Sequence, residues 1–151
     1  MKKTILSIGL LAAAFLFSSE YTFAQSKKKT KDKILANKVY TVDIAETTGK
    51  KIGKKSTDEI SFKSEKLNSK FMTSENHFPA TTYTVTVDST ANPPEITFTS
   101  EETNADGETL KWEGTITGNE MQATAVISKK GKTKKEYDIT GTMKEKPGAK
   151  K

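Results

Sequence analysis

His77 is the only histidine among the 151 residues, and the chain contains no cysteine. A zinc site needs three or four His, Cys or carboxylate ligands held in register, so this composition argues against one. A serine triad would also have to use His77, and no Gly-x-Ser-x-Gly motif or other setting for a nucleophilic serine is present. We therefore expect His77, which precedes Phe78 and Pro79, to be an ordinary loop residue, and we expect neither a metal nor a cofactor.

Four carboxylates gather around one expected turn, namely Glu101, Glu102, Asp106 and Glu108. Paired carboxylates can do acid–base chemistry when an apolar surrounding makes one of them a proton donor at neutral pH. Their neighbours here are polar, so a solvated turn is the simpler interpretation. Residues 104–107 also lack the later ligands of a calcium loop, and no glycine-rich phosphate loop occurs. The sequence predicts no catalytic residue, and we expect a protein that is not an enzyme.

Lysine supplies all 25 basic residues, against 19 acidic residues, and the net charge is +6. Much of the excess lies at both ends of the chain and in two internal segments, residues 50–55 and 129–135. Such a surface could hold an anionic polymer of a cell envelope. It could equally be a solubilising surface whose charged turns protect strand edges, which is the simpler interpretation. The absence of arginine argues against specific nucleic-acid binding, which favours the bidentate guanidinium group.

The first 24 residues have the layout of a secretory signal peptide. A basic start at Lys2 and Lys3 precedes an apolar run from Ile5 to Phe17, and a small residue, Ala24, ends the segment. We expect cleavage between Ala24 and Gln25 and a periplasmic or secreted protein; an uncleaved membrane anchor is the alternative, which the shortness of the apolar run argues against. No second apolar run follows in the sequence, so we expect no membrane span in the mature chain. A lipoprotein is excluded because it needs a cysteine at the cleavage site. Polar, lysine-rich residues 25–36 and 145–151 are expected to be disordered, which leaves 37–144 as one folded domain.

That domain contains eight stretches with the composition and alternation of β-strands. Threonine dominates their polar faces, and β-branched, aromatic and aliphatic residues occupy the other faces. No helical pattern of useful length competes after residue 24. The expected strands are residues 38–47, 58–63, 68–73, 81–88, 95–102, 108–117, 120–128 and 132–143.

The turn at Gly118 and Asn119 fixes the register of the hairpin around it, because glycine supplies the positive φ of a two-residue turn. Side chains alternate between the two faces, so the register decides which residues are buried together. The apolar or glycine pairs that result are Ile116–Met121, Gly114–Ala123, Trp112–Ala125 and Leu110–Ile127. The next loop, residues 129–131, is expected to be a three-residue turn that aligns Ala123 with Tyr137 and Met121 with Ile139.

One face of the predicted sheet collects the large aromatic residues. A three-residue loop ending at Gly107 aligns Phe98 with Gly114, and an aromatic ring opposite a strand glycine covers its bare backbone. We expect Tyr83, Phe98, Trp112 and Tyr137 to share the interior face. They could line a pocket for a small ligand or fill the interior, and the sequence leaves both interpretations open.

Short connections between sequential strands predict an all-β, up-and-down antiparallel meander that closes into a barrel, with a β-sandwich as the alternative. The pattern of Trp112, Gly114, Ile116, Gly118 and Asn119, followed by Tyr137, Ile139, Gly141 and Met143, resembles small secreted bacterial lipocalin-like (calycin-type) β-barrel proteins. The resemblance covers about the last third of the mature chain by these residues. It implies a barrel that could hold a small apolar ligand.

Two functional hypotheses follow from the sequence. The first is an exported, non-catalytic barrel that binds a small apolar or amphipathic ligand in its interior at Tyr83, Phe98, Trp112 and Tyr137. The alternative is an envelope interaction or structural protein that binds anionic surface polymers through its lysine-rich loops and ends. Either protein is expected to be a monomer that does not bind nucleic acid.

Overall fold

The computed structural model describes residues 33–48 and 53–145, which belong to a compact unit from Lys31 to Lys151. The expected signal peptide, its cleavage site and most of the expected C-terminal tail lie outside the described residues. Of the expected linker 25–36, only residues 33–36 are described. Leu35 is already fully buried there, and it belongs to the core cluster of the barrel.

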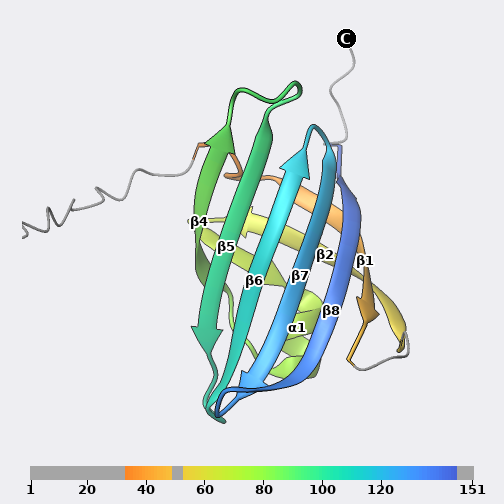
Figure 1. Ribbon diagram of the computed structural model, residues 1–151, viewed down its shortest axis with the longest axis vertical. Coiled ribbons are helices and arrows are strands. Elements are labelled where there is room, and N and C mark those ends of the chain that lie inside the picture. The colour runs from red at the N-terminus through yellow and green to blue at the C-terminus, as the bar shows by residue number, and fades with distance from the viewer. Residues whose placement is uncertain (1–32, 49–52, 146–151) are drawn as a thin grey trace, which may run out of the picture. The chain divides into compact units, whose positions relative to one another are not determined.

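Eight antiparallel strands form a closed barrel in which each strand pairs with its neighbours in the chain (Figure 1). The expected all-β, up-and-down barrel is confirmed, and the β-sandwich alternative is wrong. The strands are β1 (Val39–Glu46), β2 (Lys55–Lys63), β3 (Lys66–Ser69), β4 (Thr81–Asp88), β5 (Glu95–Thr103), β6 (Glu108–Thr117), β7 (Glu120–Lys129) and β8 (Lys132–Met143), and one helix, α1 (Lys70–Asn76), lies between β3 and β4.

The first and last strands close the barrel by a near approach of their backbones. Val42 of β1 pairs with Gly141 of β8. A Cβ atom on Gly141 would come 2.7 Å from the Cα atom of Val42 and would also collide with the carbonyl oxygen of Thr41. Only glycine fits between the two strands at this point. Closure removes the sheet edges that an open eight-stranded meander would expose.

The hairpin of β6 and β7 has the register that the sequence predicts. Trp112 pairs with Ala125, Gly114 pairs with Ala123, and the turn residue Gly118 has a φ of +61°. The neighbouring register, in which Phe98 of β5 lies opposite Gly114 of β6, is also confirmed.

The predicted register of β7 and β8 is wrong by two residues. Tyr137 pairs with Ala125 instead of Ala123, and Ile139 pairs with Ala123 instead of Met121. The turn contains two residues, Lys130 and Gly131, which both have positive φ, and an irregularity follows at Ile127 and Ser128. Because a two-residue turn plus one bulge shifts the pairing by two positions in total, the same side chains still face the interior.

The expected strand 68–73 is wrong in its second half, because α1 begins at Lys70. Ser69 is the N-cap residue, and its hydroxyl accepts a hydrogen bond of 3.1 Å from the backbone N–H of Met72. At the other end, His77 adopts the left-handed conformation that stops a helix, and the N–H of Phe78 bonds to the carbonyl of Met72 at 3.0 Å. These caps define the helix.

Candidate functional site

Phe62 of β2 lies at the centre of a group of aromatic rings in the barrel interior. Its ring makes edge-on contacts with Tyr83 and Phe98, with ring centroids 4.9 Å and 5.3 Å away, and a wider one with Tyr40 at 6.1 Å. Edge-to-face pairs of this kind add to the stabilisation that burial provides. Two of the four candidate ligand residues, Tyr83 and Phe98, therefore contact the same ring, that of Phe62. The sequence did not single out Phe62, because the turns that fix a register lie between the later strands.

The alternation of aromatic residues with glycine has a packing reason. The ring of Phe98 occupies the space into which a side chain on Gly114 would project, and the Cβ atom of Ala123 lies 2.9 Å from that position. Phe98 and Trp112 are both fully buried. Tyr83 is only half-buried, because β3 pairs with β4 through Thr81 and Thr82 alone and leaves the rest of β4 with one neighbour.

Tyr137 lies at the side of the interior that α1 covers. Its ring packs edge-on against Phe71 of α1, with centroids 5.4 Å apart. Its hydroxyl donates to Oδ1 of Asn76 at 3.3 Å, and Nζ of Lys135 donates to the same oxygen at 3.1 Å. Burial raises the pKa of the Tyr137 hydroxyl, although nearby Lys135 opposes the shift. Ala125 lies between Tyr137 and Trp112 in the register. Phe98, Trp112 and Tyr137 belong to one buried core cluster, and Tyr83 packs against that cluster.

Lys54 of one lysine-rich segment and Glu136, which directly follows the other, both bond to the chain at the end of β1. The N–H of Glu46 bonds to the carbonyl of Lys54, and the N–H of the next residue, Thr47, bonds to the carbonyl of Glu136 at 2.8 Å. The hydroxyl of Thr48 accepts a further bond of 2.8 Å from the N–H of Glu136. We call the exposed lysines at this end of the barrel the lysine end: Lys54, Lys55, Lys130, Lys132, Lys134 and Lys135.

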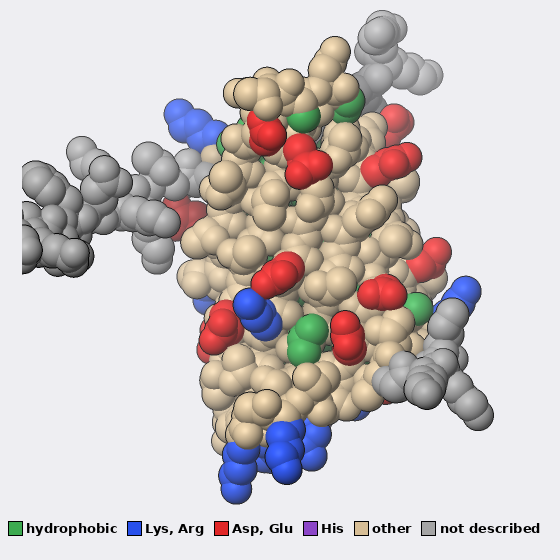
Figure 2. Space-filling view, in the orientation of Figure 1, with side chains coloured by type: hydrophobic (Ala, Val, Ile, Leu, Met, Phe, Trp, Pro, Cys, Tyr) green, Lys and Arg blue, Asp and Glu red, His purple; other side chains and the backbone are tan. Residues whose placement is uncertain are grey.

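Charge is distributed unevenly over the barrel. Figure 2 shows lysine side chains gathered at the end where the β7–β8 turn lies, while carboxylates spread over the outer wall of the strands. Lys129 is half-buried and lies 3.9 Å from a carboxylate oxygen of Glu108, so part of its charge is compensated. Among the described residues, no carboxylate lies within 4 Å of a lysine of the lysine end.

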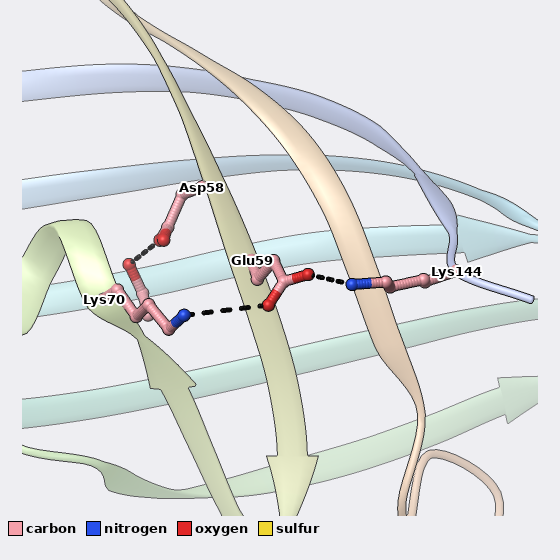
Figure 3. A network of polar contacts seen from close by, with 5 residues as sticks. Asp58, Glu59, Lys70 and Lys144 are labelled. Atoms are coloured by element: carbon pink, nitrogen blue, oxygen red, sulfur yellow. Dashed lines mark hydrogen bonds and ion pairs between the residues drawn. The ribbon is translucent and has the colours of Figure 1, made fainter. Parts of the chain in front are cut away.

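A polar groove of about 500 Å³ lies between α1 and β2, beside Lys54. Its lining includes Asp58, Glu59, Lys70, Phe71 and Ser74. Figure 3 shows three polar contacts beside this groove. Ser69 donates to the Asp58 carboxylate at 2.5 Å, while the two oxygens of Glu59 face Lys144 on one side and Lys70, at 3.8 Å, on the other.

Two further hollows of about 460 Å³ lie on the outer wall, one over β5 to β8 and one over β1, β7 and β8. None of the three hollows is lined by Tyr83, Phe98, Trp112 or Tyr137. Where the chain is described, no cluster of three or more His, Cys, Asp or Glu side chains could hold a metal ion. His77 is exposed just after α1. Within residues 33–48 and 53–145, no helix is long and apolar enough to cross a membrane.

No family model, curated protein or solved structure matches this chain. The eight-stranded closed barrel agrees with a lipocalin-like architecture. Membership of a particular family stays a prediction.

Proposed function

We propose that this protein is an exported, lipocalin-like barrel without catalytic activity, and that it binds an anionic polymer of the cell surface through the lysine end. The observation that carries the proposal is that Lys54 of one lysine-rich segment and Glu136, which directly follows the other, bond to consecutive residues at the end of β1, Glu46 and Thr47. Charges brought together in this way create a local positive potential that attracts a polyanion.

The chemistry of the lysines agrees with a polymer of repeating charge. Lysine is a flexible point charge that adapts to phosphate or carboxylate groups in many orientations, whereas arginine is favoured where planar, bidentate recognition is needed. All basic residues of this chain are lysine. Acidic residues on the outer wall would repel a polyanion from the sides of the barrel and leave the lysine end as its docking place.

An interior ligand is a second candidate, and one observation favours it. The hydroxyl of Tyr40 is buried and has no hydrogen-bond partner in the described part of the chain. Burial also raises the pKa of this hydroxyl, because the charged form would lie in an apolar surrounding. A small amphipathic molecule with one polar group could satisfy Tyr40 beside Phe62 and Tyr83. The closely packed rings around Phe62 leave this candidate second to the lysine end.

Titration at several salt concentrations tests the polymer proposal. The mature protein is titrated with polygalacturonate and with polyphosphate while sodium chloride is raised from low to physiological levels. We expect affinity to fall steeply with salt, because exposed charges are screened over about 8 Å at physiological ionic strength. Binding that is unaffected by salt, or no binding to either polymer, would contradict the proposal.

A further inference from the structure

We propose that the groove between α1 and β2 binds one sugar ring of an anionic polysaccharide whose charged groups lie on the lysine end. This inference rests on the proposed function and adds a second kind of contact to it. The lysine end attracts any polyanion, whereas the groove would select a polymer that is built of sugar rings.

The carboxylate of Asp58 is buried beside the groove. Its exposed fraction is 8%, and the hydroxyl of Ser69 is its hydrogen-bond donor among the described residues. No lysine forms an ion pair with it among the described residues. An ionised carboxylate offers about four acceptor positions, and Ser69 fills one of them. Asp58 lines the groove and has no oxygen atom that is both sealed from solvent and unpartnered, so the hydroxyl groups of a bound sugar could reach its remaining acceptor positions.

One face of α1 lines the groove. Phe71, Ser74 and Glu75 lie three and four residues apart, so they share one side of the helix and line the groove together. Phe71 is half-buried, and its edge-on contact with Tyr137 holds the ring in one orientation. Sugar rings have an apolar face of C–H groups that packs against an aromatic ring, while their hydroxyls reach polar side chains around it.

Two lysines, Lys54 and Lys70, contribute positive charge to the lining of the groove. Lys54 belongs both to the lysine end and to the groove, so a polymer lying on one continues into the other. Lys70 is held only loosely by Glu59, at 3.8 Å, and 74% of its side chain is exposed. The carboxylates of Asp58, Glu59 and Glu75 line the groove beside Lys54 and Lys70. They would repel each charged group of a polyanion, so a chain with fewer charges along its length is favoured there over a densely charged chain such as polyphosphate. A polyuronate, with one acid group and several hydroxyls on each ring, fits both features.

The groove is large enough for this role. A volume of about 500 Å³ falls within the usual range for small-molecule sites. The site also explains why a carboxylate stands on the face of β2 that carries the buried Ile60 and Phe62.

The test compares polygalacturonate with polyphosphate on the full mature chain and on two variants. Asp58→Asn keeps an oxygen that can accept from Ser69 but removes the charge, and Phe71→Leu keeps an apolar contact with Tyr137 but removes the aromatic face. Thr73→Ala, on α1 but outside the groove lining, is the control. Thermal unfolding of each variant shows that it is folded before binding is measured.

We expect each groove variant to weaken polygalacturonate binding at least about fivefold, the cost of roughly one lost hydrogen bond or ring contact. Polyphosphate affinity should change less than about twofold, which is a change in binding free energy well below about 1 kcal/mol. Equal effects on both polymers, or none on polygalacturonate, would overturn the groove while leaving the lysine end in place.

If neither polymer bound the wild-type chain, the proposed function would fail, and the groove would be tested alone. Galacturonic acid is then titrated while NMR signals of Phe71 and Ser74 are followed. Saturable shifts that vanish in Asp58→Asn would support the groove, and unchanged signals would overturn it.

Discussion

The hydroxyl of Ser69 donates a hydrogen bond of 2.5 Å to the buried carboxylate of Asp58 while it accepts one of 3.1 Å from the N–H of Met72. One side chain therefore begins the helix and partly compensates a buried charge. This contact joins β2, β3 and α1 at the place where β3 ends after only four residues. The wall of the proposed sugar groove depends on it.

Replacing Ser69 by alanine should destabilise the protein by about 2–4 kcal/mol, because a helix cap and the donor to a buried acceptor are lost together. Chemical denaturation measures this loss. Thr73→Ala removes a single hydroxyl from the exposed face of the same helix, where it bonds to the carbonyl of Ser69, and should cost no more than about 0.5 kcal/mol. Equal losses for the two variants would show that the Ser69–Asp58 contact does not stabilise the fold.

Gly114→Ala tests whether Phe98 fills the space beside the strand glycine. The added methyl group would meet the ring of Phe98 and the Cβ atom of Ala123, so we expect a loss of about 1–3 kcal/mol from overpacking. Adding Phe98→Leu to Gly114→Ala should recover part of the loss, since the smaller side chain makes room. A double-mutant cycle with additive effects would contradict this packing.

Gly118→Val tests the turn that fixes the register of β6 and β7. No heavy atom lies within 4 Å of a Cβ atom at this position, so crowding is absent and the φ of +61° is the only obstacle. We expect a loss of about 1–3 kcal/mol from backbone strain, measured by denaturation. Gly118→Asn should lose much less, because asparagine tolerates the left-handed conformation. A valine variant as stable as the asparagine variant would be evidence against this turn geometry.

The ion pairs of Glu59 should be visible in its titration. A hydrogen bond and charge attraction from Lys144, with smaller help from Lys70, hold the pKa of Glu59 below its ordinary value of 4.5. A depressed carboxyl pKa stabilises the fold above that ordinary value, and this contribution is lost as the pH falls through the lowered pKa. By NMR titration, Lys144→Met should raise the Glu59 pKa more than Lys70→Met does. The reverse order would contradict the observed geometry.

The barrel and most of its registers could be predicted because alternation and turn chemistry are local signals. Gly118 and Gly107 fixed two hairpins correctly. The turn at Lys130 and Gly131 was mistaken for a longer loop, because lysine in a left-handed conformation has no sequence signal and the compensating bulge depends on the neighbouring strand.

The groove could not be predicted from the same signals. Helix α1 has seven residues, too few for a periodic pattern, and Ser69 is recognisable as a cap only once its bond to Met72 is seen. Asp58 alternates with Ile60 and Phe62, so its inward orientation was readable, but the partner that makes burial tolerable lies eleven residues away. Likewise, the two lysine-rich segments are evident from composition, whereas the bonds that Glu46 and Thr47 make to Lys54 and Glu136 depend on the pairing of β1 with β2 and β8.

The most direct measurement of the central claim compares two triple variants that lose the same amount of charge. One replaces Lys130, Lys132 and Lys134 of the lysine end by glutamine, and the other replaces the exposed Lys33, Lys63 and Lys66, of which the last two flank the turn between β2 and β3. Polygalacturonate affinity is measured at one low salt concentration. We predict at least a tenfold loss for the first variant, or about 1.4 kcal/mol, and less than about threefold for the second. Equal losses would contradict the lysine end as the binding surface.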